Sequence, residues 1–276
     1  MKVGVSAFYA WRRGASHRGT ERQRECRQKV KKCFLDHGKR LGSRRISSET
    51  GIGRGRVRTA MKAERLEAIR PKRFVPKTTD SKHDSRISPN LLKDEANAPR
   101  RPGEAIVGDI TYLPLKNGGW CYLAMFQDKF TRRIVGWSVS ETMTARIVVD
   151  ALEQARRRGL VGRGAIVHTD RGSQYASNEY RELLSGCGFR QSMSGKGNCY
   201  DNAQAESFFS RFKTELVNGG KFDSVEHARD EAMSYIEGYY NRKRPHSALG
   251  NRPPIQFEQR FKSNKRRIDN SACGIT

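Results

Sequence analysis

The chain is 276 residues long, 36% of them hydrophobic and 30% charged, with a formal net charge of +25 at pH 7. This length accommodates one catalytic domain and a smaller module. No apolar stretch reaches the roughly 20 residues of a membrane span. The six cysteines show no close pairing, which predicts a reducing cytoplasm and no disulfide framework. Residues 1–100 carry 27 Lys and Arg against 10 Asp and Glu, whereas residues 101–276 carry 27 against 19. A basic arm on a more balanced domain is typical of nucleic-acid binding, although ribosomal-type binding or an acidic membrane would explain the same charge.

Residues 1–70 are predicted to form a small basic all-α module. A basic helix over 21–42 is followed by two shorter helices, Ser43–Glu49 and Arg56–Leu66, with a glycine-containing turn between them. Their small core is expected from Ile46, Val57 and Met61, and their outward basic side chains are Arg54, Arg56, Arg58 and Lys62. The pattern predicts a helix-turn-helix whose basic second helix enters the major groove of DNA. A basic helical hairpin that contacts only phosphates explains it equally well.

Residues 71–102 are rich in proline and charge without periodicity, and we predict a linker there. From Gly103 onward the pattern is a meander of three strands, followed by helix, strand, helix, strand and helix. The strands are expected at Ala105–Leu115, Trp120–Gln127, Ile134–Val139, before Asp170 and near Phe189–Met193, and the helices at Thr144–Arg158, Ser177–Cys187 and Val225–Tyr240. This order predicts an α/β fold of the ribonuclease-H-like kind, with a mixed five-stranded sheet covered by helices on both faces. The core is expected over residues 103–260, and a basic tail over 261–276.

Three carboxylates interrupt these elements. Asp109 lies within an apolar strand, Asp170 directly follows another strand, and Glu206 lies on a helix, with 35 residues between it and Asp170. Carboxylates in buried strand patterns are costly unless something offsets their desolvation. Taken singly, they would be an edge charge, a turn residue and a solvated helix residue. Taken together, they predict a divalent-metal site that acts on a nucleic-acid backbone.

Four stretches that include these residues resemble a known family. They are Gly108–Tyr112, His168–Tyr175, Lys196–Phe209 and the closing run Tyr239–Gly250. Over roughly Gly103 to Glu258 the chain is similar to the catalytic, second-reading-frame subunit of bacterial insertion-sequence transposases of the two-reading-frame kind, within the retroviral integrase superfamily (DDE type). Lys213, seven residues after Glu206, matches the basic position that accompanies the triad. Residues 43–66 resemble an abbreviated form of the family's helix-turn-helix.

The resemblance implies an integrase catalytic core that cuts DNA at element ends and transfers the 3′-hydroxyl into target DNA. It implies that Asp109, Asp170 and Glu206 are the catalytic residues and hold two Mg²⁺ ions, which Mn²⁺ can replace. Contacts to DNA are expected from Lys213, Arg171, Lys196, Asn198, Arg54, Arg56, Arg58, Lys62, Arg242 and Arg244. Lys196 and Asn198 lie in a glycine-containing loop just before Glu206, where the backbone can approach DNA closely.

The implied partners are the terminal repeats of the element, target DNA and further copies of the chain assembled on DNA. An upstream helix-turn-helix subunit, fused by frameshifting or acting beside this chain, is expected as well, because no heptad run here replaces its zipper. The expected location is the bacterial cytoplasm, at the nucleoid and away from any membrane.

Two other functions stay open at this point. A structure-selective nuclease of the same fold would cut without joining, and it would need neither the basic N-terminal module nor the loop before Glu206. A non-catalytic regulator would occupy element ends and leave them uncut, although carboxylates at all three positions argue against a decayed enzyme. Cleavage by the isolated chain separates the regulator from the two enzymes.

Overall fold

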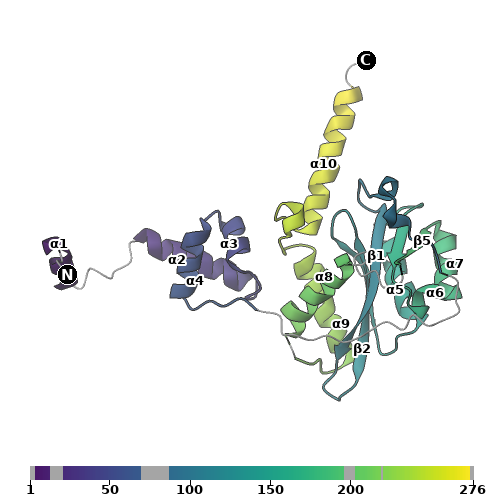
Figure 1. Cartoon of the computed structure of the whole chain (residues 1–276), viewed down its shortest axis with the longest axis horizontal. Coiled ribbons are helices and arrows are strands. Elements are labelled where there is room, and N and C mark those ends of the chain that lie inside the picture. Colours follow the sequence, from purple (N-terminus) through teal and green to yellow (C-terminus); the bar gives the residue numbers. More distant parts are fainter. Residues whose placement is uncertain (1–3, 13–20, 70–86, 196–202, 219, 274–276) are drawn as a thin grey trace. The chain divides into compact units, whose positions relative to one another are not determined.

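The computed structural model describes residues 4–12, 21–69, 87–195, 203–218 and 220–273, with side chains up to residue 265. The chain divides into two compact units, Met1–Ile69 and Arg70–Thr276 (Figure 1). No helix in the described part of the chain is both long and apolar enough to cross a bilayer.

The first unit is helical. Its elements are α1 (Val5–Arg12), α2 (Glu21–Asp36), α3 (Ser43–Thr50) and α4 (Arg54–Ala63). The predicted small core is confirmed for Ile46 and Val57, which are fully buried together with Val30 and Leu41, while Met61 packs at its edge. The long helix predicted over 21–42 ends earlier, at Asp36, because the following turn takes left-handed backbone conformations that interrupt helical hydrogen bonding.

The second unit contains one five-stranded sheet with strand order β3-β2-β1-β4-β5. Its strands are β1 (Ala105–Pro114), β2 (Trp120–Asp128), β3 (Ile134–Ser140), β4 (Ile166–Thr169) and β5 (Arg190–Met193). The first three form an antiparallel meander, and β4 and β5 run parallel to β1. The predicted mixed five-stranded sheet is therefore confirmed, and the turn between β1 and β2 contains Gly118 at φ 89°, a conformation that favours glycine.

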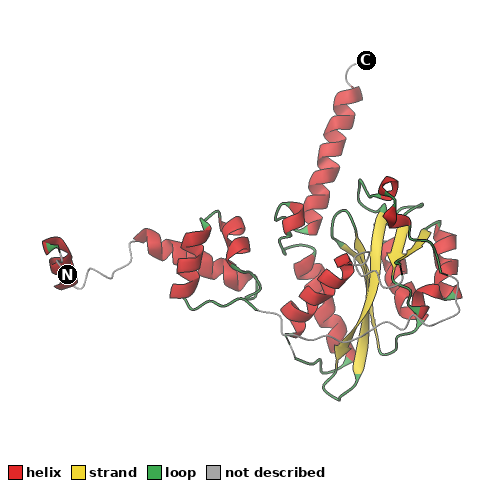
Figure 2. Ribbon diagram, viewed as in Figure 1, coloured by secondary structure: helices red, strands yellow, loops and turns green. Residues whose placement is uncertain are grey.

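Helices cover both faces of this sheet (Figure 2). On one face lie α5 (Ala145–Arg157), α6 (Ser173–Ala176) and α7 (Asn178–Cys187), which bury even-numbered β1 residues such as Ile106. On the other lie α8 (Ala203–Phe212) and α9 (Val225–Met233), which bury odd-numbered β1 residues such as Val107. The helix α5 approaches β3 closely, because a Cβ at Gly136 would collide with the backbone carbonyl of Ala151.

Two helices of the second face widen into π-helical segments. The helix α8 continues into η4 (Lys213–Val217), and α9 continues into η5 (Ser234–Tyr240). The predicted helix over Val225–Tyr240 therefore has the expected extent, but its last seven residues are π-helical. Since π-helices are rare and tend to occur at functional sites, this pair is a notable feature of the fold.

Two segments differ from the expected domain boundaries. The end of the expected linker packs along the edge strand β5: Ser88 hydrogen-bonds Gln191, and the Leu91 amide donates to Ser192 Oγ at 2.9 Å. An uncovered edge strand exposes unpaired backbone groups, which explains why the chain covers it. At the other end, α10 (Pro254–Cys273) runs through the boundary expected at residue 260. Its first turns are fixed by Arg133, which forms an ion pair with Glu258 at 2.8 Å.

Candidate active site

Asp109 lies near the middle of β1, on the face that α8 and α9 cover. Strand alternation puts its side chain on the same side as those of Val107 and Leu113, which are both fully buried. One carboxylate oxygen accepts a hydrogen bond from the Ile110 amide at 2.8 Å. The parallel pairing of β1 with β4 covers only Ala105–Val107, so Asp109 lies just beyond the last paired rung.

Asp170 follows the last residue of β4. Because β1 and β4 are parallel neighbours, Asp170 emerges at the end of the sheet toward which Asp109 also lies. Its Oδ1 accepts a hydrogen bond from the Gly172 amide at 2.9 Å, which fixes the carboxylate over the tight turn into α6. Two adjacent strands therefore position the first two carboxylates.

Glu206 lies in the first turn of α8 and is exposed to solvent. The helix is held against the sheet by Ala205, Phe208, Phe209 and Phe212, which are all buried. Lys213 is two turns further on, where η4 begins, and its ammonium lies 5.0 Å from the centre of the Tyr112 ring.

The electrostatics link all four side chains. The pKa of Asp109 is raised from 3.8 to about 8, first because burial penalises the charged form and then because Asp170 and Glu206 oppose a further negative charge. The hydrogen bond from Ile110 and the positive charge of Lys213 act in the opposite direction. The structure therefore brings the three predicted carboxylates, and the predicted lysine, within electrostatic range of one another.

These carboxylates do not yet form a finished coordination site. Among the described residues, no three acidic, histidine or cysteine side chains already stand in an arrangement that holds a metal ion. Their chemistry nonetheless fits a divalent cation, because Mg²⁺ prefers a few carboxylate oxygens and retains several waters. The raised pKa of Asp109 points the same way, since a bound cation would relieve the crowding of negative charge that causes part of it.

Apart from Lys213 and Arg244, the residues expected to contact DNA fall into three groups. Exposed side chains on helices or turns are Arg54, Arg56, Arg58, Lys62 and Arg242. Lys196 and Asn198 lie outside the described residues, with most of the loop before Glu206. Arg171 is partly buried and donates from Nε to the Ser194 carbonyl at 2.8 Å, so it connects the residues that follow β4 and β5. Contacts of these residues with DNA stay predictions.

The expectation for Arg244 is wrong. Its side chain is only 3% exposed, and the guanidinium forms an ion pair with Glu215 at 2.8 Å. A group so completely enclosed and paired is not available to a phosphate. Of the run of basic residues around it, Arg242 and Lys243 are exposed to solvent.

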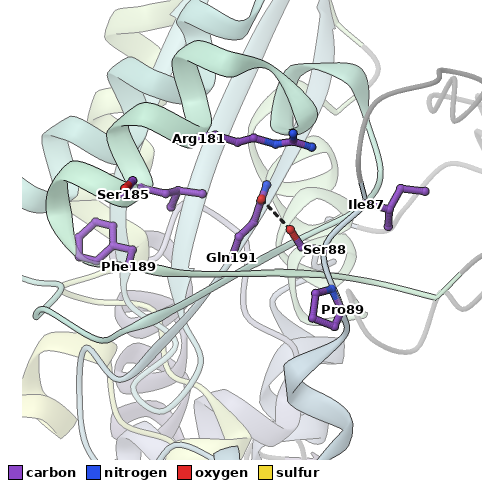
Figure 3. A pocket seen from close by; sticks show the side chains of 8 residues that line it. Ile87, Ser88, Pro89, Arg181, Ser185, Phe189 and Gln191 are labelled. Carbon is purple, nitrogen blue, oxygen red and sulfur yellow. Dashed lines mark hydrogen bonds between the residues drawn. The ribbon is translucent and has the colours of Figure 1, made fainter.

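A pocket of about 390 Å³ lies elsewhere in the second unit, at the β5 edge of the sheet (Figure 3). Pro89, Arg181, Phe189 and Gln191 are among its lining residues, and the hydrogen bond between Ser88 and Gln191 crosses it. None of the three carboxylates lines it. The candidate site is therefore the carboxylate cluster, not the pocket.

Tyr112 and Glu215 were not singled out by the sequence analysis. Tyr112 is three residues after Asp109 in the strand motif, and its ring lies against Lys213. The sequence signal for Tyr112 is a large aromatic residue in the same strand motif as the first carboxylate. For Glu215 no local signal exists, because its partner Arg244 is 29 residues away.

Residues 99–199 and 187–254 match two family models, each described as an integrase core domain. The chain is 38% identical over 267 residues to the Escherichia coli K12 "Transposase InsF for insertion sequence IS3A", which covers 94% of this chain and 92% of that protein. It is 36% identical over 271 residues to a 31 kDa protein of insertion element IS600 from Shigella sonnei, with 94% and 96% covered. The Lactococcus lactis transposase of IS904 is 40% identical over 237 residues, with 84% and 92% covered.

Among solved structures the likeness is more distant. A chain of the simian T-cell lymphotropic virus intasome, in complex with PP2A regulatory subunit B56 gamma, matches with 15% identity and a TM-score of 0.48, over 83% of this chain and 74% of that one. The catalytic core domain of HTLV-2 integrase in complex with magnesium matches with 15% identity and a TM-score of 0.45, over 58% and 99%.

Proposed function

Because this chain belongs to the insertion-sequence transposases with an integrase core domain, we propose that Asp109, Asp170 and Glu206 are the residues with which it cuts and joins DNA strands. The chain is a polynucleotidyl transferase that acts on DNA in transposition and integration. The observation that supports these three residues is the mutual effect of their charges, which together with burial raises the pKa of Asp109 to about 8.

The proposed cofactor is a pair of Mg²⁺ ions, which when bound would stabilise charge on the attacking and leaving oxygens of the scissile phosphate. Asp109 and Asp170 would provide oxygen ligands from adjacent strands, and Glu206 would complete the set from α8. Their role is to hold the phosphate and its attacking oxygen in line, since positioning and charge stabilisation are the main contributions to phosphoryl transfer.

Two successive displacements are proposed at this site. In the first, water attacks the phosphodiester at the element end, one P–O bond forms as another breaks, and a 3′-hydroxyl is released. In the second, that hydroxyl attacks a phosphodiester of the target, and the displaced 3′-oxygen of the target leaves with a proton. The first step hydrolyses one phosphodiester and the second exchanges one phosphodiester for another. Neither step needs a covalent protein–DNA intermediate.

The remaining basic residues are proposed to hold DNA around this centre. Lys213, close to Asp109, would contact a phosphate beside the cleaved bond. The exposed basic face of α4 would bind the DNA of the element end. Two ends must be cut for transposition, so we propose at least two copies of the chain in the complex, with an upstream helix-turn-helix subunit acting with them or fused by frameshifting.

The decisive experiment uses labelled element-end DNA, purified protein and Mg²⁺, beside a Glu206→Gln variant. Cutting and joining that require both the metal and Glu206 are expected. An exposed carboxylate away from the cluster, changed by Asp230→Asn, is the matched control and should leave both reactions intact. Cutting without joining would instead indicate a nuclease, and binding without cutting by either protein would indicate a regulator.

A further inference from the structure

Lys213 occupies the point where α8 becomes π-helical. A π-helical turn takes one more residue than an α-helical turn and is less favourable, so an isolated segment of this kind usually reverts to α-helix. The segment η4 begins at Lys213 and ends at Val217, directly after the helix that carries Glu206. Side chains outside η4 must therefore stabilise it.

The structure contains such a group, which we call the Glu215 lock: Glu215, Arg244 and Tyr235. The Arg244 guanidinium donates to both Glu215 oxygens, at 2.8 to 3.1 Å, and the Tyr235 hydroxyl donates to Glu215 Oε2 at 2.9 Å. All three residues are buried. The lock thus joins η4, η5 and the closing run of the family resemblance.

Aromatic contacts connect the lock to α8, the helix that carries Glu206. The ring of Phe212, next to Lys213, packs edge-on against Tyr235 with centroids 5.2 Å apart. Phe208, two residues after Glu206, packs edge-on against Tyr240 at 4.9 Å, and the Tyr240 hydroxyl accepts a hydrogen bond from Gln127 of β2 at 2.7 Å. These contacts fix the rotation of α8 and η4 relative to the sheet.

Stability alone is a poor explanation for a buried ion pair. Removing two charges from water costs about as much as their attraction returns, and well-packed apolar residues of similar volume often stabilise a fold as much or more. What a bidentate Arg–Glu pair adds is a defined geometry, because its hydrogen bonds are directional. In this fold the geometry that it defines is that of η4.

The residue whose position depends on η4 and which faces the site is Lys213. Its ammonium lies over the Tyr112 ring, and that ring also packs edge-on against Trp120 at 5.2 Å. Burial lowers the pKa of Lys213, and the negative charge of Asp109 acts in the opposite direction. Lys213 is the first residue of η4, so a change of η4 to ordinary α-helix would alter the backbone turn that directly follows it.

We propose that the Glu215 lock is a positioning device for the reaction: it holds η4 in its π-helical form so that Lys213 meets the substrate phosphate beside Asp109. Glu215, Arg244 and Tyr235 touch neither DNA nor metal. They act through Lys213 alone. This inference rests on the proposed function, in which Lys213 contacts a phosphate near the cleaved bond.

The test is a double-mutant cycle. The lock variant combines Glu215→Leu with Arg244→Met, which replaces both charges by apolar groups of similar size and leaves no unpaired charge. It is compared with wild type, Lys213→Ala and the combination of both. We expect the lock variant to slow strand transfer by about 10- to 100-fold, as a misplaced contact does, and to cause less than about twofold further loss in the Lys213→Ala background.

The salt dependence of DNA binding, measured without metal, provides a second readout for the same variants. Loss of one phosphate contact should lower the slope of log binding affinity against log salt by about one, in the lock variant and in Lys213→Ala alike. The control exchanges a partly buried ion pair of the same kind, by Arg133→Met with Glu258→Leu, and should change neither the transfer rate nor the salt slope. Tyr235→Phe, which removes one hydroxyl, is the milder lock variant and replaces the double variant if that one does not fold. It should slow transfer by about 2- to 5-fold.

Three results would overturn the inference: equal slowing in both Lys213 backgrounds, which indicates a general structural role; an unchanged rate in the lock variant; or a Tyr235→Phe effect that persists without Lys213. The proposed function fails in a distinguishable way. If Glu206→Gln still cuts and joins, the carboxylate site is wrong whatever the lock does. If Glu206→Gln is inactive and Lys213→Ala is fully active, only the lysine contact and this inference fall.

Discussion

The amide of Asn241 pairs with the backbone of Ile134 as a neighbouring strand would. Its Oδ1 accepts from the Ile134 amide at 2.9 Å, and its Nδ2 donates to the Ile134 carbonyl at 3.0 Å. Both groups are at the start of β3, and Asn241 is fully buried. One side chain from the closing run therefore satisfies two backbone groups at an edge of the sheet.

Asn241→Ala should lower the free energy of unfolding by about 2–4 kcal/mol, because it leaves a buried donor and a buried acceptor unpaired. Denaturant unfolding followed by circular dichroism measures this change. Asn241→Asp should be at least as harmful, since a carboxylate cannot donate to the Ile134 carbonyl. The neighbouring exposed residue serves as control, and Arg242→Ala should change stability by less than about 0.5 kcal/mol.

Asp109→Asn should stabilise the metal-free protein at neutral pH. The pKa of Asp109 is about 8 when folded and near 3.8 when unfolded, so the folded state binds its proton more tightly. Stability contributed by that proton is fully present below pH 3.8 and is lost as the pH rises toward 8. The variant avoids this loss, and its gain should grow from near zero at pH 4 to about 1–3 kcal/mol at pH 7.

Thermal unfolding in a chelator, across pH 4 to 8, measures the Asp109 effect. Asp150 provides the control: its side chain is 44% exposed and pairs with Arg146, so Asp150→Asn should give no comparable gain. Added Mg²⁺ should raise the melting temperature of wild type more than that of Asp109→Asn, since a ligand stabilises only the state that binds it. A gain that does not depend on pH would contradict the assigned protonation.

Gly136→Ala should destabilise the core, because an added Cβ would press against the Ala151 carbonyl of α5 and the helix would have to move off β3. Overpacking of this kind costs about 1–3 kcal/mol, and more where backbone is the obstacle. Gly162→Ala adds the same methyl group where nothing lies within 4 Å, and is expected to be close to neutral. Equal melting temperatures for the two variants would show that α5 can move off β3 at little cost in stability.

Removing the basic face of α4 should weaken DNA binding. The variant replaces Arg54, Arg56, Arg58 and Lys62 by Ala, all four of which are exposed. If each contacts one phosphate, the slope of log affinity against log salt should fall by about four, equally for end DNA and random DNA. If α4 enters the major groove, the variant should lose more affinity for end DNA than for random DNA. Fluorescence anisotropy at several salt concentrations separates the two.

Much of the fold follows from local patterns. The alternation in β1 and the glycine turn after it predict the first hairpin, and the apolar stripe of α5 predicts both its length and its buried face. The π-helical form of η5 does not follow, because an apolar stripe such as Ala232, Tyr235 and Ile236 suits an α-helix as well. Its buried neighbours lie far away in the sequence: Tyr235 of η5, for example, donates to Glu215, which is 20 residues earlier.

The candidate site was predictable for a different reason. Asp109 and Asp170 contradict the apolar strands that contain or precede them, and a costly residue in a strand pattern is a visible signal. Arg244 shows the opposite case: its neighbours Arg242 and Lys243 are exposed, so local composition indicates a basic surface. Burial of Arg244 depends on a tertiary partner that composition does not reveal.

The segment along β5 also limits how copies of this chain can assemble. The sheet ends at β3 on one side and at β5 on the other, and residues 88–91 lie along β5, where the Met193 amide donates to the Pro89 carbonyl and the Leu91 amide donates to Ser192 Oγ. Joining two sheets into one continuous sheet requires free edges on both partners. The β3 edge is occupied as well, because Asn241 takes up both backbone groups of Ile134 and Gln154 accepts from the Trp137 amide. Extension of one sheet into another is therefore hindered at both edges, and copies of the catalytic core are expected to meet through other surfaces.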